Sequence, residues 1–282
     1  YGAKVAGKSE VVDHTAIGKR AVVKVYVTTV GTRDDLVALV MEKLTGKKIS
    51  LDIGKLIEVL MMCDAGGFVP TIIFDVERAS TSGRPADLQD VRSLAKALIG
   101  YCRCIIVISE ANAMLEFGKD MLREKFIFVD EMTAPEARQF LQVRGSRLSD
   151  GEMQYVFDTI GTSPVTLISL MYRVAAGKLP LNDFVNGVLR GARRDLRKFK
   201  LQPILEALKE HPEGVSPDFF NSLEYRGIDM SNPDEVGSAM RGSNAIIYRI
   251  ELEMYQLMSV AHKTALKTYT SIIGKSYNAI AE

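Results

Sequence analysis

The first 130 residues alternate between short apolar runs and amphipathic segments, and this alternation constrains the fold more than any other feature. Four runs rich in β-branched and aromatic residues have the character of buried strands: Ala21–Thr29, Thr71–Phe74, Cys104–Ser109 and Phe126–Val129. Apolar residues recur at helical spacing in four further segments: Asp34–Leu44, Leu51–Cys63, Leu88–Leu98 and Ala111–Leu122. Short strands without polar alternation, separated by helices, predict an α/β fold with a parallel sheet and helices on both faces.

After Val129 the pattern changes to successive helices with no strand between them. Four helices are predicted first: Ala134–Arg144, Asp150–Ile160, Pro164–Ala176 and Asp183–Phe199. Three short helices, a two-stranded hairpin and a last helix follow: Pro203–Lys209, Pro217–Tyr225, Pro233–Met240, Ala245–Arg249 paired with Tyr255–Ser259, and Ala261–Ile273. Three helices and a hairpin are the outline of a winged-helix domain. We therefore expect three domains, over residues 1–132, 133–200 and 201–282.

The sharpest motif is the octapeptide GAKVAGKS, which matches the phosphate-loop pattern G-x-x-x-x-G-K-[ST] in full. Gly2 and Gly7 permit the backbone conformations that point successive N–H groups at a polyphosphate. Lys8 supplies positive charge for the outer phosphates, and the Ser9 hydroxyl can ligate Mg²⁺. These four residues are the predicted nucleotide-binding set, and Ser9 is also a predicted metal ligand.

The surroundings of this loop bear on how it is presented. A helix predicted over Glu10–Ile17 begins directly after the loop, and a helix N-terminus favours anions. A phosphate loop normally follows the central strand of its sheet, whereas only Tyr1 precedes it here. We expect upstream sequence to supply that strand, so that the functional protein is longer than these 282 residues.

Acidic residues at the end of the second expected strand form another candidate group. Asp75 directly follows the apolar run TIIF, where an acid can hold the Mg²⁺ of a bound nucleotide. Glu77 is the candidate general base that would polarise an attacking water. A plain surface position is an equally open interpretation of Glu77.

Two residues near later strands have functional and structural interpretations that the sequence does not separate. Ser109 ends the strand CIIVIS, where it can sense the terminal phosphate, hold the attacking water, or cap the next helix. Arg123 precedes Phe126–Val129 and is either an arginine finger for the nucleotide of a neighbouring subunit or an exposed surface arginine. Together with Glu77, these two residues complete the candidate catalytic set.

These segments together resemble an AAA+-type ATPase, and more closely the STAND and archaeal-ATPase branch of that group. GAKVAGKS, TIIFDVE and CIIVIS carry the resemblance in the first domain, and VDEMTAPEARQFLQVRG at Val129–Gly145 resembles the passage into a helical lid. Gly161-Thr162-Ser163-Pro164 is similar to the Gly-x-Pro signature of that lid. The resemblance implies a P-loop NTPase fold, an α-helical lid and a winged-helix domain, with ATP and Mg²⁺ as ligands and Pro164 as a nucleotide contact.

Composition limits the other function classes. The chain is 47% hydrophobic and 25% charged, with 36 basic and 35 acidic residues, which excludes a disordered chain and a uniformly basic nucleic-acid coat. Its three cysteines and three histidines show no zinc spacing, and its apolar runs are too short to span a membrane. We therefore expect a soluble protein of a reduced, intracellular compartment.

Three functions remain open from the sequence. The first is an ATPase whose bound ATP switches the domain arrangement or drives assembly into a homo-oligomer or larger complex, with a protein partner at the winged helix. The second is a nucleotide-binding regulatory or structural module with little hydrolysis, because Val76 separates Asp75 from Glu77 where the family usually places its two acids together. The third is a nucleic-acid-binding protein that uses the wing and the basic stretch Arg190–Lys200, RGARRDLRKFK, which is otherwise a solvated helix face.

Overall fold

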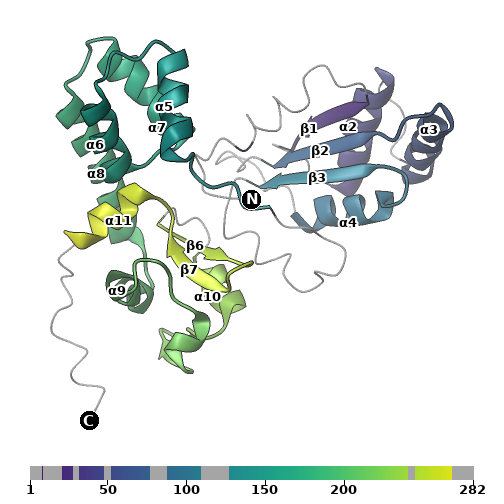
Figure 1. Ribbon diagram of the computed structural model, residues 1–282. Helices are drawn as coiled ribbons and strands as arrows, with labels where there is room; N and C mark the ends of the chain where they lie inside the picture. Colours follow the sequence, from purple (N-terminus) through teal and green to yellow (C-terminus); the bar gives the residue numbers. More distant parts are fainter. Residues whose placement is uncertain are drawn as a thin grey trace. The chain divides into compact units, whose positions relative to one another are not determined.

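The computed structural model describes residues 8, 21–27, 32–47, 52–76, 88–108, 127–240 and 245–268. The chain divides into two compact units, Tyr1–Asp130 and Glu131–Glu282, whose elements are drawn in Figure 1. The first unit contains a parallel sheet, and the second is built mainly of helices. A further division of the second unit at residue 200 stays a prediction.

A parallel three-stranded sheet forms the centre of the first unit, in the order β1-β2-β3. Its strands are β1 Val22–Tyr26, β2 Thr71–Val76 and β3 Arg103–Ile108. Phe74 of β2 pairs with Val25 on one side and with Ile106 on the other. Every residue of β2 after Thr71 is buried, as expected for a central parallel strand with both faces covered.

Three described helices pack together on one face of this sheet: α2 Arg33–Thr45, α3 Ile53–Ala65 and α4 Leu88–Leu98. Local signals set the ends of α2, because the Thr32 side chain accepts a hydrogen bond from a first-turn N–H and Gly46 takes a left-handed conformation with φ of 71°. The apolar faces of all three helices form one core with alternate residues of the strands, including Ile72 and Phe74. Helices on this face are therefore confirmed at nearly the predicted positions.

The second unit begins with a group of helices: α5 Ala134–Val143, α6 Asp150–Ile160, α7 Pro164–Leu170 and α8 Leu181–Lys198. A π-helical turn, η3 at Met171–Ala175, continues α7. Capping boxes start α5 and α6, from Thr133 with Glu136 and from Ser149 with Glu152. These caps explain why the sequence places both helix starts correctly, since a capping box is a local signal.

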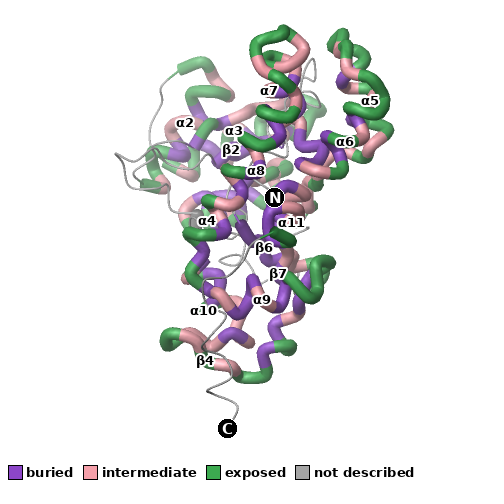
Figure 2. Tube along the Cα trace, turned by 90° about the vertical axis from the view of Figure 1, so that its left-hand side faces the viewer, coloured by how far each residue is buried: buried purple, intermediate pink, exposed green. Residues whose placement is uncertain are grey.

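The rest of the chain forms short elements and a final helix: α9 Gln202–Glu210, the 3-10 turn η4 Pro217–Phe220, β4 Glu224–Tyr225, β5 Ile228–Asp229, α10 Pro233–Ala239, β6 Ile246–Arg249, β7 Met254–Leu257 and α11 Val260–Lys267. β6 and β7 form the predicted antiparallel hairpin, and Figure 2 shows buried stretches along both strands. The last helix, α11, packs against α8 and α6, as Figure 1 shows. The C-terminal part thus closes back onto the first helices of the unit.

Two predicted elements differ from the structure. The helix predicted over Pro217–Tyr225 is wrong beyond its first turn, because Asn221 and Ser222 take left-handed conformations with φ of 40° and 63° and direct the chain into β4. The strand predicted over Phe126–Val129 is wrong for its described part. Ile127 and Phe128 are irregular, and Val129 forms only an isolated bridge. A strand needs a continuous ladder of neighbours, which an apolar composition alone does not supply.

Other predictions fall beyond what the structure describes. The helices predicted over Glu10–Ile17 and Ala111–Leu122 lie outside the described residues, as does the end of the helix predicted over Ala261–Ile273. Within the described ranges, no helix combines the length and the apolar character needed to cross a bilayer.

Candidate functional site

The structure describes part of the predicted site. Lys8, Asp75 and Pro164 are described, and the remaining predicted site residues lie outside the described residues: Gly2, Gly7, Ser9, Glu77, Ser109 and Arg123. Lys8 and Asp75 belong to the first unit, and Pro164 belongs to the second. The described part of the site thus consists of a basic and an acidic residue in the first unit and of a turn in the second unit.

Asp75 is a buried acidic residue on β2, the middle strand of the sheet in the first unit. It lies near the carboxyl end of β2 and is fully buried, with 0% of its surface exposed. Because the three strands are parallel, their carboxyl ends meet at the same edge of the sheet, which is where ligands of open α/β sheets bind. Asp75 faces away from the core that the three helices share, since it alternates with Phe74 and Val76. Asp75 is thus the residue before the last of β2, and its role as a magnesium ligand stays a prediction.

A lysine that the sequence reasoning missed holds the Asp75 carboxylate. The Lys24 Nζ lies 2.9 Å from Asp75 Oδ2, and the Lys24 side chain is 13% exposed. Lys24 comes from β1, and its ammonium group also lies 4.6 Å from the centre of the Tyr26 ring. A signal existed in the sequence, because Lys24 is the charged residue within the otherwise apolar run AVVKVYV. A charge in the middle of a buried strand requires a partner.

Lys8, from the phosphate-loop motif, is buried beside this pair. Only 5% of its surface is exposed. Burial lowers the pKa of Lys8 to about 8, and the negative charge of Asp75 partly opposes that lowering. The ammonium group thus remains mostly protonated at pH 7, and a polyphosphate placed against it would raise its pKa again.

These three side chains form a small electrostatic site at the carboxyl edge of the sheet. Lys8 and Lys24 contribute two positive charges, and Asp75 contributes one negative charge. Lysine ammonium groups in a place where little water screens them favour an anion such as a phosphate group.

In the second unit, Pro164 is the first residue of α7 and follows a tightly held turn. Gly161 has φ of 87°, and a β-carbon there would overlap the Glu131 carboxylate. Glu131 Oε2 accepts a hydrogen bond of 2.9 Å from the Thr162 N–H, and the Thr162 hydroxyl donates to the Met132 carbonyl. The Gly-Thr-Ser-Pro turn is thus bound to the segment that leads into α5. A contact of Pro164 with nucleotide stays a prediction.

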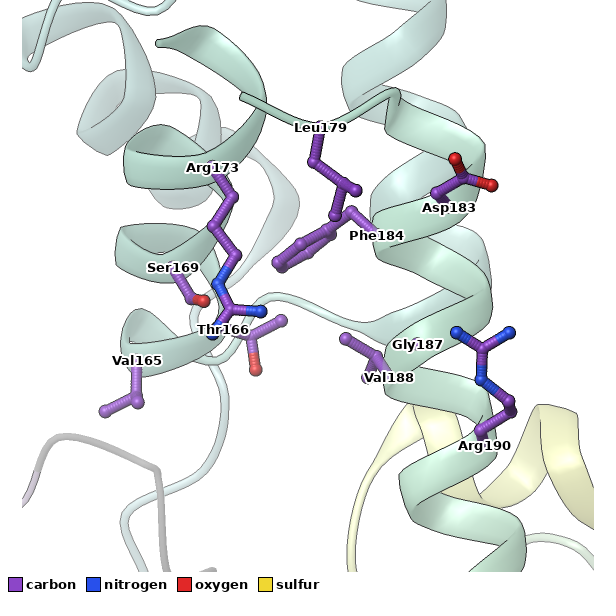
Figure 3. Close-up of a pocket in the computed structure, with 10 residues that line it drawn as sticks. All are labelled: Val165, Thr166, Ser169, Arg173, Leu179, Asp183, Phe184, Gly187, Val188 and Arg190. Atoms are coloured by element: carbon purple, nitrogen blue, oxygen red, sulfur yellow. The ribbon is translucent and has the colours of Figure 1, made fainter. Parts of the chain in front are cut away.

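A cavity of about 620 Å³ lies between α7 with η3 and α8, and Figure 3 shows it. Ten residues line it: Val165, Thr166, Ser169, Arg173, Leu179, Asp183, Phe184, Gly187, Val188 and Arg190. Two arginines and one aspartate give this lining a mixed charge. Among the predicted site residues that the structure describes, Pro164 belongs to the same unit as the cavity and does not line it.

Comparison with known proteins places the fold. No protein-family model matches the chain, and no curated protein matches it in sequence. A solved structure of a Walker-type ATPase from Pyrococcus abyssi is similar, with a TM-score of 0.56 and 13% identity over 94% of this chain and 89% of that one. The fold of this chain is thus similar to the fold of that ATPase. The ORC2 protein of Aeropyrum pernix, solved in ADPNP–ADP complexes, matches 95% of this chain and 84% of its own length at a TM-score of 0.45 and 13% identity.

Proposed function

We propose that this protein binds ATP with Mg²⁺ at the loop Gly2–Ser9, and that the bound nucleotide switches its conformation or assembly. The observation that carries the proposal is the burial of Lys8 beside the Asp75 carboxylate, at the carboxyl edge of a parallel sheet. A lysine from a complete phosphate-loop motif and an acid at the end of a neighbouring strand are the two charges that a magnesium nucleotide needs. The Walker-type fold supports the same assignment.

Different groups of the loop would contact different parts of a triphosphate. The backbone N–H groups around Gly2 and Gly7 would cradle the phosphates, and Lys8 would contact the outer ones. Ser9 and Asp75 would hold Mg²⁺, which neutralises phosphate charge when it is bound. The Asp75 carboxylate fits that role because oxygen ligands suit Mg²⁺, but Lys24 already pairs with one of its oxygens. We therefore expect Mg²⁺ to bind well only together with nucleotide.

Hydrolysis would depend on residues other than those that hold the phosphates and Mg²⁺. Glu77 would orient the attacking water as general base, and Ser109 would contact the terminal phosphate or that water. Arg123 would act on the nucleotide of a neighbouring subunit, which requires a homo-oligomer or a larger assembly. Pro164 would contact the adenine base from the helical lid, and the predicted winged-helix region at residues 201–282 would receive a protein partner.

Binding of ATP to purified protein, measured by calorimetry with and without Mg²⁺, tests the proposal. Lys8→Ala should abolish binding, whereas Lys4→Ala should leave it nearly unchanged. Lys4 is the matched control because it occupies a free position of the same motif. Light scattering with and without ATP then reports assembly. Equal loss of affinity in both variants would mean that general loop charge, rather than a phosphate loop, binds the ligand.

The Lys24–Asp75 ion pair supports a second candidate function, a nucleotide-binding module with little hydrolysis. A carboxylate already neutralised by Lys24 at 2.9 Å is a weaker magnesium ligand. Val76 also separates Asp75 from the candidate base Glu77. Phosphate release by wild type and Glu77→Gln distinguishes the two functions. An ATPase should lose turnover in the variant while keeping affinity, and a binding module should show negligible turnover in both.

The exposed basic surface of α8 supports nucleic-acid binding as a further candidate. Four residues on this helix are exposed and basic: Arg190, Arg194, Arg197 and Lys198. A surface that contacts phosphates loses affinity steeply with salt, by about 0.9 log units per tenfold salt for each contact. Binding of a short DNA duplex across a salt series tests this function. A double variant, Arg194→Glu with Arg197→Glu, should lower both the affinity and the salt dependence.

A further inference from the structure

Two cysteines meet at the start of β3. Cys102 directly precedes the strand and Cys104 is its second residue, and their Sγ atoms lie 3.6 Å apart. Side chains two residues apart in a regular strand are separated by about 6.6 Å, since each residue advances the chain by about 3.3 Å. The thiols are therefore brought together by a local bend and not by ordinary strand geometry.

The turn between α4 and β3 produces this bend. Gly100 has φ of 99°, a left-handed conformation that glycine adopts without strain. The N–H groups of Tyr101 and Cys102 both donate to the carbonyl of Leu98, at 3.1 and 3.3 Å. The chain thus folds tightly onto the last turn of α4 immediately before the strand begins. The proximity of the two thiols is a consequence of the fold.

The two sulfurs differ in their surroundings. The Cys102 thiol also lies 3.7 Å from the Leu98 carbonyl, and the Cys104 thiol lies 3.9 Å from the Ala95 carbonyl. A hydrogen bond from Cys104 lowers the pKa of Cys102, whereas the same bond and burial raise the pKa of Cys104. Both side chains are half-buried. One thiol of the pair can thus ionise and attack while its neighbour is in position to resolve the product, and the direction of the two pKa shifts favours Cys102 as the attacking thiol.

We propose that Cys102 and Cys104 form a redox-modification site that a hydroperoxide converts to an intrachain disulfide. The Cys102 thiolate attacks the peroxide oxygen and forms a sulfenic acid, and the O–O bond breaks with release of one water or alcohol. The Cys104 sulfur then attacks the Cys102 sulfur, and the hydroxyl group leaves as water. In total the two thiols lose two protons and two electrons, and the peroxide takes up both as it is reduced to water and an alcohol, or to two waters.

The geometry makes this disulfide a labile one. The sulfurs must approach from 3.6 Å to the bond length of about 2.05 Å, within a ring closed by a single intervening residue, Arg103. Strained disulfides are more easily reduced, which is the property of regulatory bonds rather than structural ones. Glutathione should therefore return the protein to its dithiol form. This site does not depend on nucleotide binding.

Peptide mapping of the full chain tests the proposal directly. After treatment with hydrogen peroxide, free thiols are blocked with N-ethylmaleimide in denaturant, and the protein is digested with trypsin without reduction. Cleavage after Arg103 separates the two cysteines, so the disulfide appears as ALIGYCR joined to CIIVISEANAMLEFGK. We expect this linked pair to be the main oxidised species, and to disappear after incubation with reduced glutathione.

Serine variants provide the controls. Cys63→Ser should leave the linked peptides unchanged, because Cys63 lies on α3 and has no thiol contact with the pair. Cys102→Ser and Cys104→Ser should each abolish them, and circular dichroism checks that both variants fold. Three results would overturn the proposal: alkylation of all three cysteines after peroxide, a stable sulfenic acid at Cys102 without linkage, or Cys63 joined to either member of the pair.

Discussion

Replacing Lys24 by methionine tests whether the ion pair beneath the candidate site stabilises the first unit. Two unit charges 2.9 Å apart attract each other by about 6 kcal/mol at an effective dielectric constant of about 20. Desolvation of the Lys24 ammonium offsets several kcal/mol of that attraction. Lys8 remains near Asp75 to compensate part of its charge. We therefore expect Lys24→Met to lower the free energy of unfolding by about 3 kcal/mol, because a fully buried carboxylate loses the ammonium group that pairs with it.

Urea unfolding followed by circular dichroism measures this change, since the chain has no tryptophan to report by fluorescence. Lys55→Met is the matched control, because Lys55 is exposed on α3 of the same unit, and it should change stability by less than about 0.5 kcal/mol. The double variant Lys24→Met with Asp75→Asn should recover part of the loss, since the buried carboxylate is gone and only the Lys8 ammonium then lacks the Asp75 charge. A loss below about 0.5 kcal/mol in Lys24→Met, or strictly additive effects in the double variant, would refute the reasoning.

Three further predictions concern the pH dependence of stability, the pH dependence of ATP affinity, and the turn before α7. The pKa of Lys8 is about 8 in the folded protein and 10.5 ordinarily, so the unfolded chain binds more protons than the folded one between these two pH values. The free energy of unfolding of the nucleotide-free protein should therefore rise with pH across this window, as measured by urea titrations. ATP affinity should instead fall by about tenfold per pH unit above 8 as Lys8 loses its charge, and a Lys8→Arg variant that still binds should show no such fall in calorimetry. Gly161→Ala should destabilise the protein by about 1 kcal/mol more than Gly145→Ala, because both glycines have positive φ but only Gly161 lies against the Glu131 carboxylate, whose displacement would break its hydrogen bond with the Thr162 N–H. Equal melting temperatures for the two alanine variants would contradict this assignment.

Some elements were predictable because their causes are local in the chain. Thr32 starts α2, and the capping boxes at Thr133 and Ser149 start α5 and α6 through contacts within one turn. The apolar run TIIF forms a buried strand because β-branched residues suit a covered sheet. The sequence pattern did not predict a helix end that depends on backbone conformation. The helix expected to continue through Asn221 and Ser222 ends there because both residues take left-handed conformations.

The candidate site shows the same division. A complete phosphate-loop motif and an acid after an apolar run can be recognised in the sequence itself. Lys8 and Asp75 were therefore candidate site residues before the structure was known. Lys24 was not assigned, because its role depends on which strand lies beside β2 and in what register. Lys24 pairs opposite Ile73 and reaches Asp75 diagonally, and no spacing along the chain encodes that neighbour.

The sequence by itself determined the alternation of strands and helices, the caps that start them and the loop that suits a phosphate, since each depends on residues close together in the chain. Only the tertiary structure decided that Lys24 pairs with a buried carboxylate whose charge also acts on Lys8, and that a turn at Gly100 brings two thiols within 3.6 Å. The physical reason is that pairing, burial and desolvation arise between segments that the chain brings together only when it folds.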